Sequence, residues 1–226
     1  MAQSIGLRLK RAVRPAVLPL LTRLRQRQFP GSRDYWEDRY AAGETSGDGS
    51  YGVLAQFKAD VLNAFVREHD VQTVMEFGCG DGNQLTLADY PTYLGLDVAP
   101  TSIDMCRKLF ANDPAKSFYL YDTRRFVDNA RIFHADLTLS LDVIYHLVED
   151  EVFEGYLRHL FAAADRNVIV YATNSPIPDI GVHVRHRHFT PWIETNLPDW
   201  RLTETIENAH PDKDGRADFF VYERVT

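Results

Sequence analysis

Cysteine is scarce in this sequence: Cys79 and Cys106 are the only two in 226 residues. Neither belongs to a CxxC pair or to a Cys/His spacing that binds zinc, which argues against a disulfide scaffold and a structural zinc site. Two isolated thiols are typical of a reducing compartment, so we expect the protein in the cytoplasm. Long apolar runs are also lacking, because no stretch approaches the roughly 20 apolar residues that cross a membrane.

Acidic residues are missing from residues 1–33, which hold eight Lys and Arg side chains. The rest of the chain has 17 basic and 32 acidic residues, a net charge of −15. A body this acidic argues against a general nucleic-acid binder, and we expect no nucleic-acid partner. The apolar stretch of this basic arm is broken by Pro19 and followed by more arginines, unlike a cleaved signal peptide.

The basic arm has apolar residues near one helical face and prolines at positions 15 and 19. We therefore predict a basic amphipathic N-terminal extension over residues 1–33, interrupted by those prolines. It either packs on the protein or docks on an anionic membrane surface or a partner. A linker signal, "FPGS", separates it from one domain over residues 34–226, since a chain of this length that is 45% hydrophobic supports a single core.

Strand-like and helix-like segments alternate along the rest of the chain. Apolar or β-branched segments predict strands at 71–77, 92–96, 117–121, 135–143 and 167–172, and helical spacing occurs at 53–68, 84–90, 102–110, 149–163 and 191–195. This alternation with short connections predicts a doubly wound α/β fold, in which a mostly parallel sheet has helices on both faces. The last two segments, 200–207 and 217–224, alternate as an antiparallel pair does.

The segment "VMEFGCGDG" at residues 74–82 ends an apolar strand in an acid, Glu76, followed by three glycines at alternate positions. Glycines between a strand and a helix let a ligand reach the backbone close to a helix N-terminus. A carboxylate at this place would repel the phosphates of NAD or ATP, and it suits a ligand with a positive group. By itself, the glycine pattern also fits a tight turn without a ligand.

Two more acids follow the next two predicted strands. Asp97 stands 21 residues after Glu76, at a place where an acid accepts both hydroxyls of a ribose in doubly wound sheets. Asp122 ends the third strand, where a side chain can accept a hydrogen bond from an adenine amino group. Because the carboxyl ends of parallel strands meet at one edge of a sheet, the three acids predict a nucleoside site at that edge.

Three segments, "VMEFGCGDG", "YLGLDVAPTSI" and "LTLSLDVIYHL", resemble the first, second and fourth motifs of class I S-adenosylmethionine-dependent methyltransferases. The resemblance covers about residues 50–226 and implies a Rossmann-like sheet of seven strands with an antiparallel C-terminal hairpin. It also implies S-adenosyl-L-methionine as the cofactor, with Glu76 anchoring the glycine loop or reaching the cofactor's ammonium group. The segment "YWEDRYAAGETSGDGSYG" resembles the cofactor-capping segment of bacterial methyltransferases, which we place within residues 34–68.

The resemblance also implies a set of cofactor contacts, carried onto this sequence motif by motif. From the capping segment to the fourth strand, they are Tyr35, Arg39, Tyr40, Gly52, Glu76, Gly78, Gly80, Asp97, Val98, Ser102, Asp122, Thr123 and Ser140. The glycines among them are expected to let the amino-acid part of the cofactor approach the backbone.

Groups that act on the methyl acceptor are expected just past the fourth and fifth strands. His146 can accept a proton near neutral pH, and Asp142 could orient it or bind a divalent cation such as Mg²⁺. The alternative for His146 is a histidine that only packs under the next helix. The predicted substrate contacts are Tyr145, His183, Arg185 and His186, because a basic loop suits an anionic or polyhydroxylated substrate. That loop could instead be solvated surface, or it could supply a rival base.

The whole chain looks most like bacterial small-molecule and sugar O-methyltransferases, which favours methyl transfer to a hydroxyl of a sugar or glycan, on a lipid-linked or polysaccharide precursor. The alternatives are N- or O-methylation of an aromatic or amino metabolite, a nucleotide-binding oxidoreductase and an inactive binding module. The stretch "SLDV" stands where base-modifying enzymes carry "NPPY", which argues against nucleic-acid methylation. A homodimer is left open.

Overall fold

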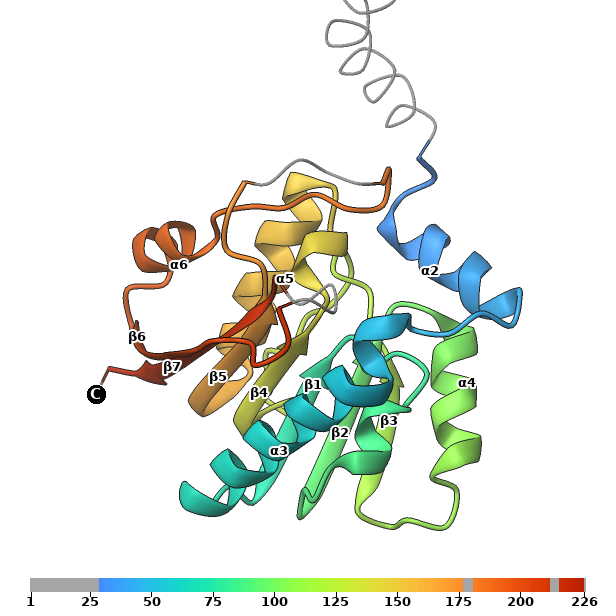
Figure 1. The fold of residues 1–226 in the computed structure, drawn as a ribbon, viewed down its shortest axis with the longest axis horizontal. Coiled ribbons are helices and arrows are strands. Elements are labelled where there is room, and N and C mark those ends of the chain that lie inside the picture. The colour runs from blue at the N-terminus through green and yellow to red at the C-terminus, as the bar shows by residue number, and fades with distance from the viewer. Residues whose placement is uncertain (1–28, 177–180, 212–215, 226) are drawn as a thin grey trace, which may run out of the picture.

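The computed structural model describes residues 29–176, 181–211 and 216–225, so most of the predicted basic arm lies outside the described residues. The centre of the molecule is a seven-stranded sheet with the order β3-β2-β1-β4-β5-β7-β6 (Figure 1). The strands are β1 (Thr73–Phe77), β2 (Thr92–Asp97), β3 (Lys116–Leu120), β4 (Ala135–Leu141), β5 (Ala164–Ala172), β6 (Trp200–Ile206) and β7 (Asp218–Arg224). In the described ranges, no helix is long and apolar enough to cross a bilayer.

The sheet is parallel except at its C-terminal end. β1 pairs in parallel with β2 and β4, β2 pairs with β3, and β4 pairs with β5. β7 is antiparallel to both β5 and β6. The predicted doubly wound fold with an antiparallel C-terminal hairpin is therefore confirmed. The strand order reverses between β1 and β4, and in such sheets ligands bind at the carboxyl ends of the strands beside that switch point.

Helices cover both faces of the sheet (Figure 1). They are α2 (Ser32–Ala41), α3 (Gly52–Glu68), α4 (Pro100–Leu109), α5 (Asp150–Ala162) and α6 (Thr190–Asn196), with single 3-10 turns η1 (Asp48–Ser50), η2 (Gln84–Leu87) and η3 (Ile144–His146). Met75 and Phe77 of β1 pack in the hydrophobic cluster beneath α5, whereas Val74 packs in the cluster beneath α3. Because side chains alternate along a strand, Glu76 points to the α3 side.

The buried face of α3 carries one charged residue. Helical spacing places Leu54, Ala55, Ala59 and Leu62 against the sheet, as the periodicity of this segment predicts. Lys58 lies on the same face and its side chain is completely buried. A buried lysine needs a partner for its charge, so its surroundings matter for the site at the sheet edge.

Two segments differ from the sequence prediction. Residues 32–41 form α2, which the patterns did not predict as a helix because its apolar residues form no single stripe. Residues 84–87 form only a 3-10 turn, shorter than the predicted helix to residue 90. Pro91 restricts Tyr90 to extended backbone, which is consistent with an early end to that helix.

Candidate cofactor and active site

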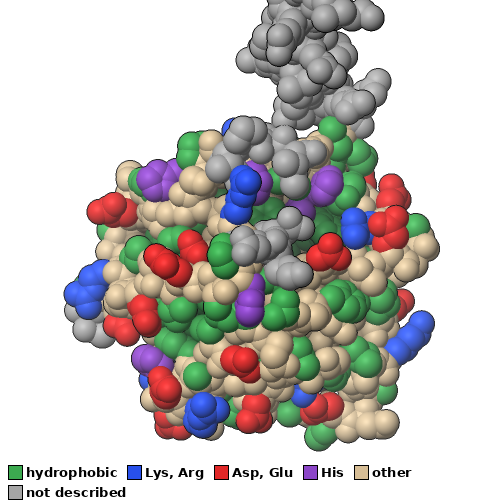
Figure 2. Space-filling model, in the orientation of Figure 1, with side chains coloured by type: hydrophobic (Ala, Val, Ile, Leu, Met, Phe, Trp, Pro, Cys, Tyr) green, Lys and Arg blue, Asp and Glu red, His purple; other side chains and the backbone are tan. Residues whose placement is uncertain are grey.

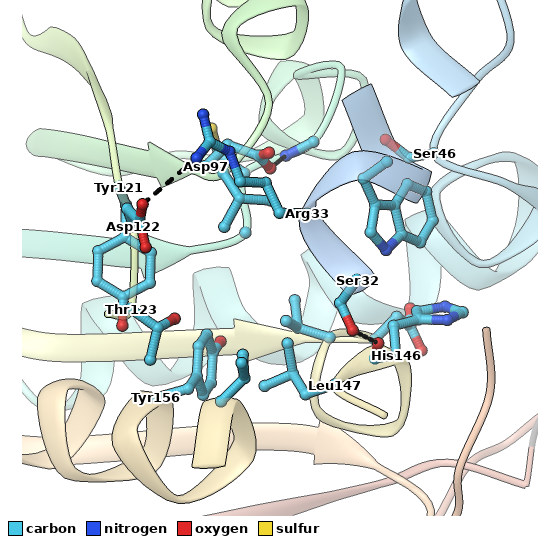
Figure 3. Close-up of a pocket in the computed structure, with 18 of the residues that line it drawn as sticks. Ser32, Arg33, Ser46, Asp97, Tyr121, Asp122, Thr123, His146, Leu147 and Tyr156 are labelled. Carbon is cyan, nitrogen blue, oxygen red and sulfur yellow. Dashed lines mark hydrogen bonds and ion pairs between the residues drawn. The ribbon is translucent and has the colours of Figure 1, made fainter. Parts of the chain in front are cut away.

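A cavity of about 330 Å³ lies along the carboxyl edge of the sheet. Its walls come from α2, the glycine loop, the ends of β2 and β3, and the segment that follows β4. Figure 3 shows Asp97, Asp122 and His146 around this cavity, together with Ser32 and Arg33 from α2. Parts of the chain far apart in the sequence therefore meet in one site.

The glycine loop is shaped by the protein's own packing. Gly78 and Gly80 have φ of 89° and 58°, values that side chains other than glycine rarely adopt. A Cβ at Gly78 would lie 2.5 Å from Val143, and a Cβ at Gly80 would lie 2.4 Å from the hydroxyl of Ser46. These glycines therefore make room for the two segments that close over the loop, which the sequence did not predict. That they also make room for the cofactor stays a prediction.

Asp97 joins the end of β2 to the glycine loop. Its carboxylate accepts hydrogen bonds from the backbone N–H of Gly80 and of Ala99, each at 2.9 Å. Burial raises the pKa of Asp97 to about 6, although these backbone donors act in the opposite direction. Asp97 and its neighbour Val98 both lie in the cavity wall, at the place predicted for the ribose.

Glu76 lies in the wall on the α3 side of the cavity. Its Oε2 accepts a hydrogen bond of 2.6 Å from the hydroxyl of Tyr93. Burial raises the pKa of Glu76 to about 7, while the hydrogen bond from Tyr93 and the charge of Lys58 lower it. Glu76 therefore changes charge near neutral pH in the unliganded protein.

Asp122 and Thr123 wall the opposite end of the cavity. Asp122 accepts a hydrogen bond of 3.0 Å from the backbone N–H of Arg124. Arg33 reaches from α2 across the cavity, and its guanidinium lies 3.4 Å from Asp122 Oδ2 (Figure 3). The end predicted for adenine is therefore closed by a side chain that the sequence did not connect with it.

Helix α2 is tied across the cavity at its first residue and near its middle. The backbone N–H of Ser32 donates to Glu149 Oε1 at 3.0 Å, and its hydroxyl lies 2.5 Å from Glu149 Oε2 and 2.8 Å from the carbonyl of His146. Glu37 accepts hydrogen bonds from the N–H and the hydroxyl of Thr101 at the start of α4. We call α2 the strap.

Replacing Ser32 by alanine should lower the free energy of unfolding by about 1.5–3 kcal/mol, the usual worth of hydrogen bonds to a charged group. Burial alone would raise the pKa of Glu149, but the hydrogen bonds from Ser32 lower it. A carboxyl group whose pKa is lowered by folding stabilises the fold at pH values above its pKa in the unfolded chain. That stability is lost as the pH falls through the folded-state pKa, so the difference in unfolding free energy between wild type and variant should shrink in the acidic range. Urea denaturation at neutral and acidic pH measures both effects.

Thr86→Ala is the matched control, because Thr86 also donates a hydroxyl hydrogen bond but does so on the exposed surface. Thr86→Ala should lower the free energy of unfolding by less than Ser32→Ala does. Equal losses in the two variants, with no dependence on pH, would show that Ser32 does not hold the strap.

His146 ends the 3-10 turn η3 and lies in the cavity wall. Its Nδ1 is 3.0 Å from the carbonyl oxygen of His183. A carbonyl only accepts, so Nδ1 carries the proton and Nε2 keeps its lone pair. Burial lowers the pKa of His146 to about 4, which leaves the imidazole neutral at pH 7. The ring of Trp36 from the strap packs edge-on against the His146 imidazole, with ring centroids 4.9 Å apart.

Asp142 does not orient His146, which corrects one predicted role. Its Oδ2 lies 2.6 Å from Lys58 Nζ, and its Oδ1 accepts a 2.8 Å hydrogen bond from Tyr145. The ammonium of Lys58 lies beside the carboxylate where a divalent cation was predicted, and binding of such a cation by Asp142 stays a prediction. Among the described residues, no group of three His, Cys, Asp or Glu side chains could hold a metal ion.

Two predicted cofactor contacts instead support the wall from behind. The hydroxyl of Ser102 donates to the carbonyl of Gly80 at 2.5 Å, from the first turn of α4. Ser140 lies 2.7 Å from the hydroxyl of Tyr156, which also donates to the carbonyl of Phe77. Tyr156 itself lies in the cavity wall, whereas Ser140 lies behind it and does not reach the cavity.

The predicted contacts from the capping segment divide into two groups. Tyr40 lies in the wall, with its hydroxyl 3.0 Å from Ser46. Tyr35, Arg39 and Gly52 lie outside it. Tyr35 stacks on His183 with ring centroids 4.5 Å apart, Arg39 donates to the carbonyl of Thr45, and Gly52 begins α3. That the wall residues bind the cofactor stays a prediction.

The basic loop after β5 has a structural role that its composition did not reveal. Arg185 donates to the carbonyl of Val148, and Arg187 donates to the carbonyls of Leu147 and Val148. His186 lies 2.6 Å from the hydroxyl of Thr173. None of the predicted substrate contacts Tyr145, His183, Arg185 and His186 lies in the cavity wall. The loop holds the segment that carries His146.

Sequence reasoning also missed part of the wall, including Trp36, Lys58 and Asp81. Asp81, inside the glycine loop, accepts hydrogen bonds from the N–H of Ser46 and the hydroxyl of Tyr51. Lys58 could have been found as the charged residue on the apolar face of a predicted helix. The strap residues carried no comparable signal.

Comparison with known proteins gives partial matches. No protein-family model matches the chain. A small RNA 2'-O-methyltransferase of Arabidopsis thaliana is 35% identical over 112 residues, which cover 45% of this chain and 12% of that protein. The chain thus spans about an eighth of the length of this curated relative.

Solved structures agree in fold over most of the chain. N-methyltransferase NodS from Bradyrhizobium japonicum, in complex with S-adenosyl-L-homocysteine, superposes with a TM-score of 0.66 at 14% identity, covering 87% of this chain and 100% of that one. The methyltransferase domain of bacterial CtHen1-C gives a TM-score of 0.61 at 16% identity, covering 76% and 98%. The strand order and these superpositions together show that the chain has the class I S-adenosylmethionine-dependent methyltransferase fold.

Proposed function

We propose that the protein is an S-adenosylmethionine-dependent methyltransferase. The observation that carries this proposal is the meeting of three acids in one cavity. Glu76 and Asp97 lie at the carboxyl ends of β1 and β2, Asp122 follows the adjacent strand β3, and all three wall the cavity next to the glycine loop. Their spacing along one edge suits a ligand with an ammonium group, a ribose and an adenine.

The oxidoreductase alternative fits this molecule less well. Dinucleotide-binding sheets have the order 3-2-1-4-5-6 with parallel strands, whereas here the antiparallel β7 lies between β5 and β6. The wall near the glycine loop also offers the carboxylates of Glu76, Asp81 and Asp97. Such a wall would repel a pyrophosphate and would attract the cationic half of S-adenosylmethionine.

The acceptor that we propose is a sugar hydroxyl. When bound, the cofactor would supply an electrophilic methyl group, and this chain's residues would position the hydroxyl and remove its proton. His146 fits the second task, because its imidazole is neutral and its Nε2 keeps a lone pair. We place proton acceptance at that atom.

A ribose 2'-hydroxyl of RNA is the second candidate, supported by the 35% identity to the Arabidopsis small RNA 2'-O-methyltransferase. The charge of the molecule supports it less. On the face shown in Figure 2, the acidic and basic side chains of the described residues are interspersed and form no continuous basic track for a phosphate backbone. A glycan hydroxyl therefore remains our first proposal. Contact of the basic arm with an anionic membrane, and a homodimer, also remain proposals.

Transfer of a labelled methyl group from S-adenosylmethionine tests the proposed function. The acceptor arms are oligosaccharides, a short RNA, the same RNA with a 2'-deoxy 3' end, and an amine such as glucosamine. We expect label on an oligosaccharide. Label on the RNA but not on its 2'-deoxy control would identify the second candidate. Label on the amine nitrogen would overturn the hydroxyl proposal, and binding of the cofactor without transfer to any arm would favour an inactive binding module.

The affinity for S-adenosylhomocysteine should fall as the pH drops. In the unliganded protein, burial raises the pKa of Glu76 to about 7 and that of Asp97 to about 6. Both carboxyls must be ionised to accept hydrogen bonds from the ligand, so a proton is released on binding below these values. The affinity should fall about tenfold per pH unit for each carboxyl group that must lose its proton. Calorimetry from pH 5 to 9 measures this, and a flat profile would contradict it.

A further inference from the structure

Lys58 is the buried charge that the proposed chemistry does not yet use. It lies in the middle of α3 on the face packed against the sheet, and its side chain has no exposed surface. Lysine is almost never fully buried unless its charge is paired, because an isolated ammonium in a protein interior is strongly disfavoured. The position of Lys58 in the wall of the candidate site therefore suggests a role there.

The contacts of Lys58 lead directly to the cavity. Its Nζ lies 2.6 Å from Asp142 Oδ2 and 5.4 Å from the centre of the Tyr171 ring. Asp142 is partly exposed, with 17% of its side-chain surface accessible, and it lies in the cavity wall with Glu76. Lys58 has no exposed surface, so it acts on a ligand through these two carboxylates.

Asp142 is held in place from several sides. Its backbone has φ of 61°, a left-handed conformation that residues other than glycine rarely adopt. Tyr145 donates to its Oδ1 at 2.8 Å, while a Cβ at Gly49 would lie 2.9 Å from its Oδ2. The fold therefore keeps this carboxylate at the cavity despite backbone strain. The ammonium of Lys58 compensates the negative charge of the carboxylate there.

We propose that Lys58 is a positioning residue for the cationic half of the cofactor: its ammonium fixes Asp142 and balances Glu76, so that both carboxylates face the cavity as anions. This inference rests on the proposed function. Two carboxylates and one ammonium leave a net charge of −1 at this end. That charge complements the methionine half of S-adenosylmethionine, which carries an ammonium, a sulfonium and one carboxylate.

Charged and titratable groups from several elements face Glu76. They are Lys58 from α3, Tyr93 and Asp97 from β2, Cys79 from the glycine loop, Tyr90 from the segment before β2, Asp142 after β4, and Tyr156 from α5. Burial has the largest effect on the pKa of Glu76 and raises it. The hydrogen bond from Tyr93 and then the charge of Lys58 lower this pKa, while the charges of Asp97 and Asp142 raise it. Removing Lys58 and removing the charge of Asp142 must therefore move the titration of Glu76 in opposite directions.

The experiment measures the affinity for S-adenosylhomocysteine as a function of pH, by calorimetry on the full chain. In Lys58→Met, the pH at which affinity is half lost should rise by about one unit. The ionised fraction of Glu76 at pH 7, and with it the affinity, should then fall about fivefold. Lys58→Arg should restore the wild-type profile in part, because it keeps the charge. In Asp142→Asn, the midpoint should move to lower pH. Lys116→Met is the control, because Lys116 is also an ion-paired lysine, remote from the cavity.

A structural role alone would lower the melting temperature of Lys58→Met without moving the midpoint, and that result would overturn the proposal. If Lys58→Met does not fold, Asp142→Asn and Lys58→Arg still test the proposal. An unmoved pH midpoint of binding in Asp142→Asn would contradict it equally. Failure of the wild type to bind S-adenosylhomocysteine at any pH would instead refute the proposed function, so the two failures are distinguishable.

Discussion

Asp97→Ala should weaken the binding of S-adenosylhomocysteine by roughly 30- to 150-fold, which corresponds to about 2–3 kcal/mol. Two losses combine in this variant. The ribose hydroxyls lose their charged acceptor, and the backbone N–H groups of Gly80 and Ala99 lose the carboxylate that holds the glycine loop. Calorimetry at pH 8, where Asp97 is ionised, measures the change.

Asp97→Asn separates these two losses. Asparagine keeps the shape and one oxygen, so one of the two backbone contacts can persist while the charge is removed. We expect an affinity between those of the wild type and the alanine variant. Melting temperatures should be recorded for both variants, because loosening of the glycine loop lowers stability. Unchanged affinity in a folded Asp97→Ala protein would show that the ribose does not bind at this carboxylate.

His146→Ala should lower turnover by about 100- to 10,000-fold, the usual contribution of a general base, on the acceptor found by the transfer assay. The affinity for S-adenosylhomocysteine should stay nearly unchanged. Burial lowers the pKa of His146 to about 4, so the base stays deprotonated well below neutral pH. At saturating cofactor, protonation of His146 should therefore lower the wild-type rate only near pH 4. A histidine with the reference pKa would lower it near pH 6.5.

His186→Ala tests the rival base in the loop after β5. His186 contacts Thr173 outside the cavity wall, so this variant should keep most of the turnover. His183→Ala keeps the backbone carbonyl that receives the proton of His146 Nδ1, and it should lose less than His146→Ala does. Full turnover in His146→Ala together with a large loss in either loop variant would move the base to the loop.

The parts of the site that the sequence predicted well depend on local rules. Glu76, Asp97 and Asp122 each lie at or just past the carboxyl end of a strand. Parallel strands bring such residues to one edge, so their meeting in the cavity follows from spacing. The alternation of strands and helices predicted the sheet in the same way. The antiparallel C-terminal pair was also visible in the alternation of its two segments.

The parts that were missed depend on contacts between distant residues. Ser32 and Glu149 are 117 positions apart, and Lys58 and Asp142 are 84 positions apart, so no spacing rule connects them. The arginines after β5 suggested an anionic substrate by composition, but a guanidinium donates equally well to backbone carbonyls, which is what Arg185 does. Only the fold decides between these partners.

The most direct test of the proposed function is a pair of calorimetric titrations of the wild-type protein at pH 8. One uses S-adenosylhomocysteine and the other uses NAD. The three acids in the cavity wall predict one site with micromolar-range affinity for S-adenosylhomocysteine and no measurable binding of NAD, whose pyrophosphate would meet the carboxylates near the glycine loop. Tight binding of NAD without binding of S-adenosylhomocysteine would contradict the account.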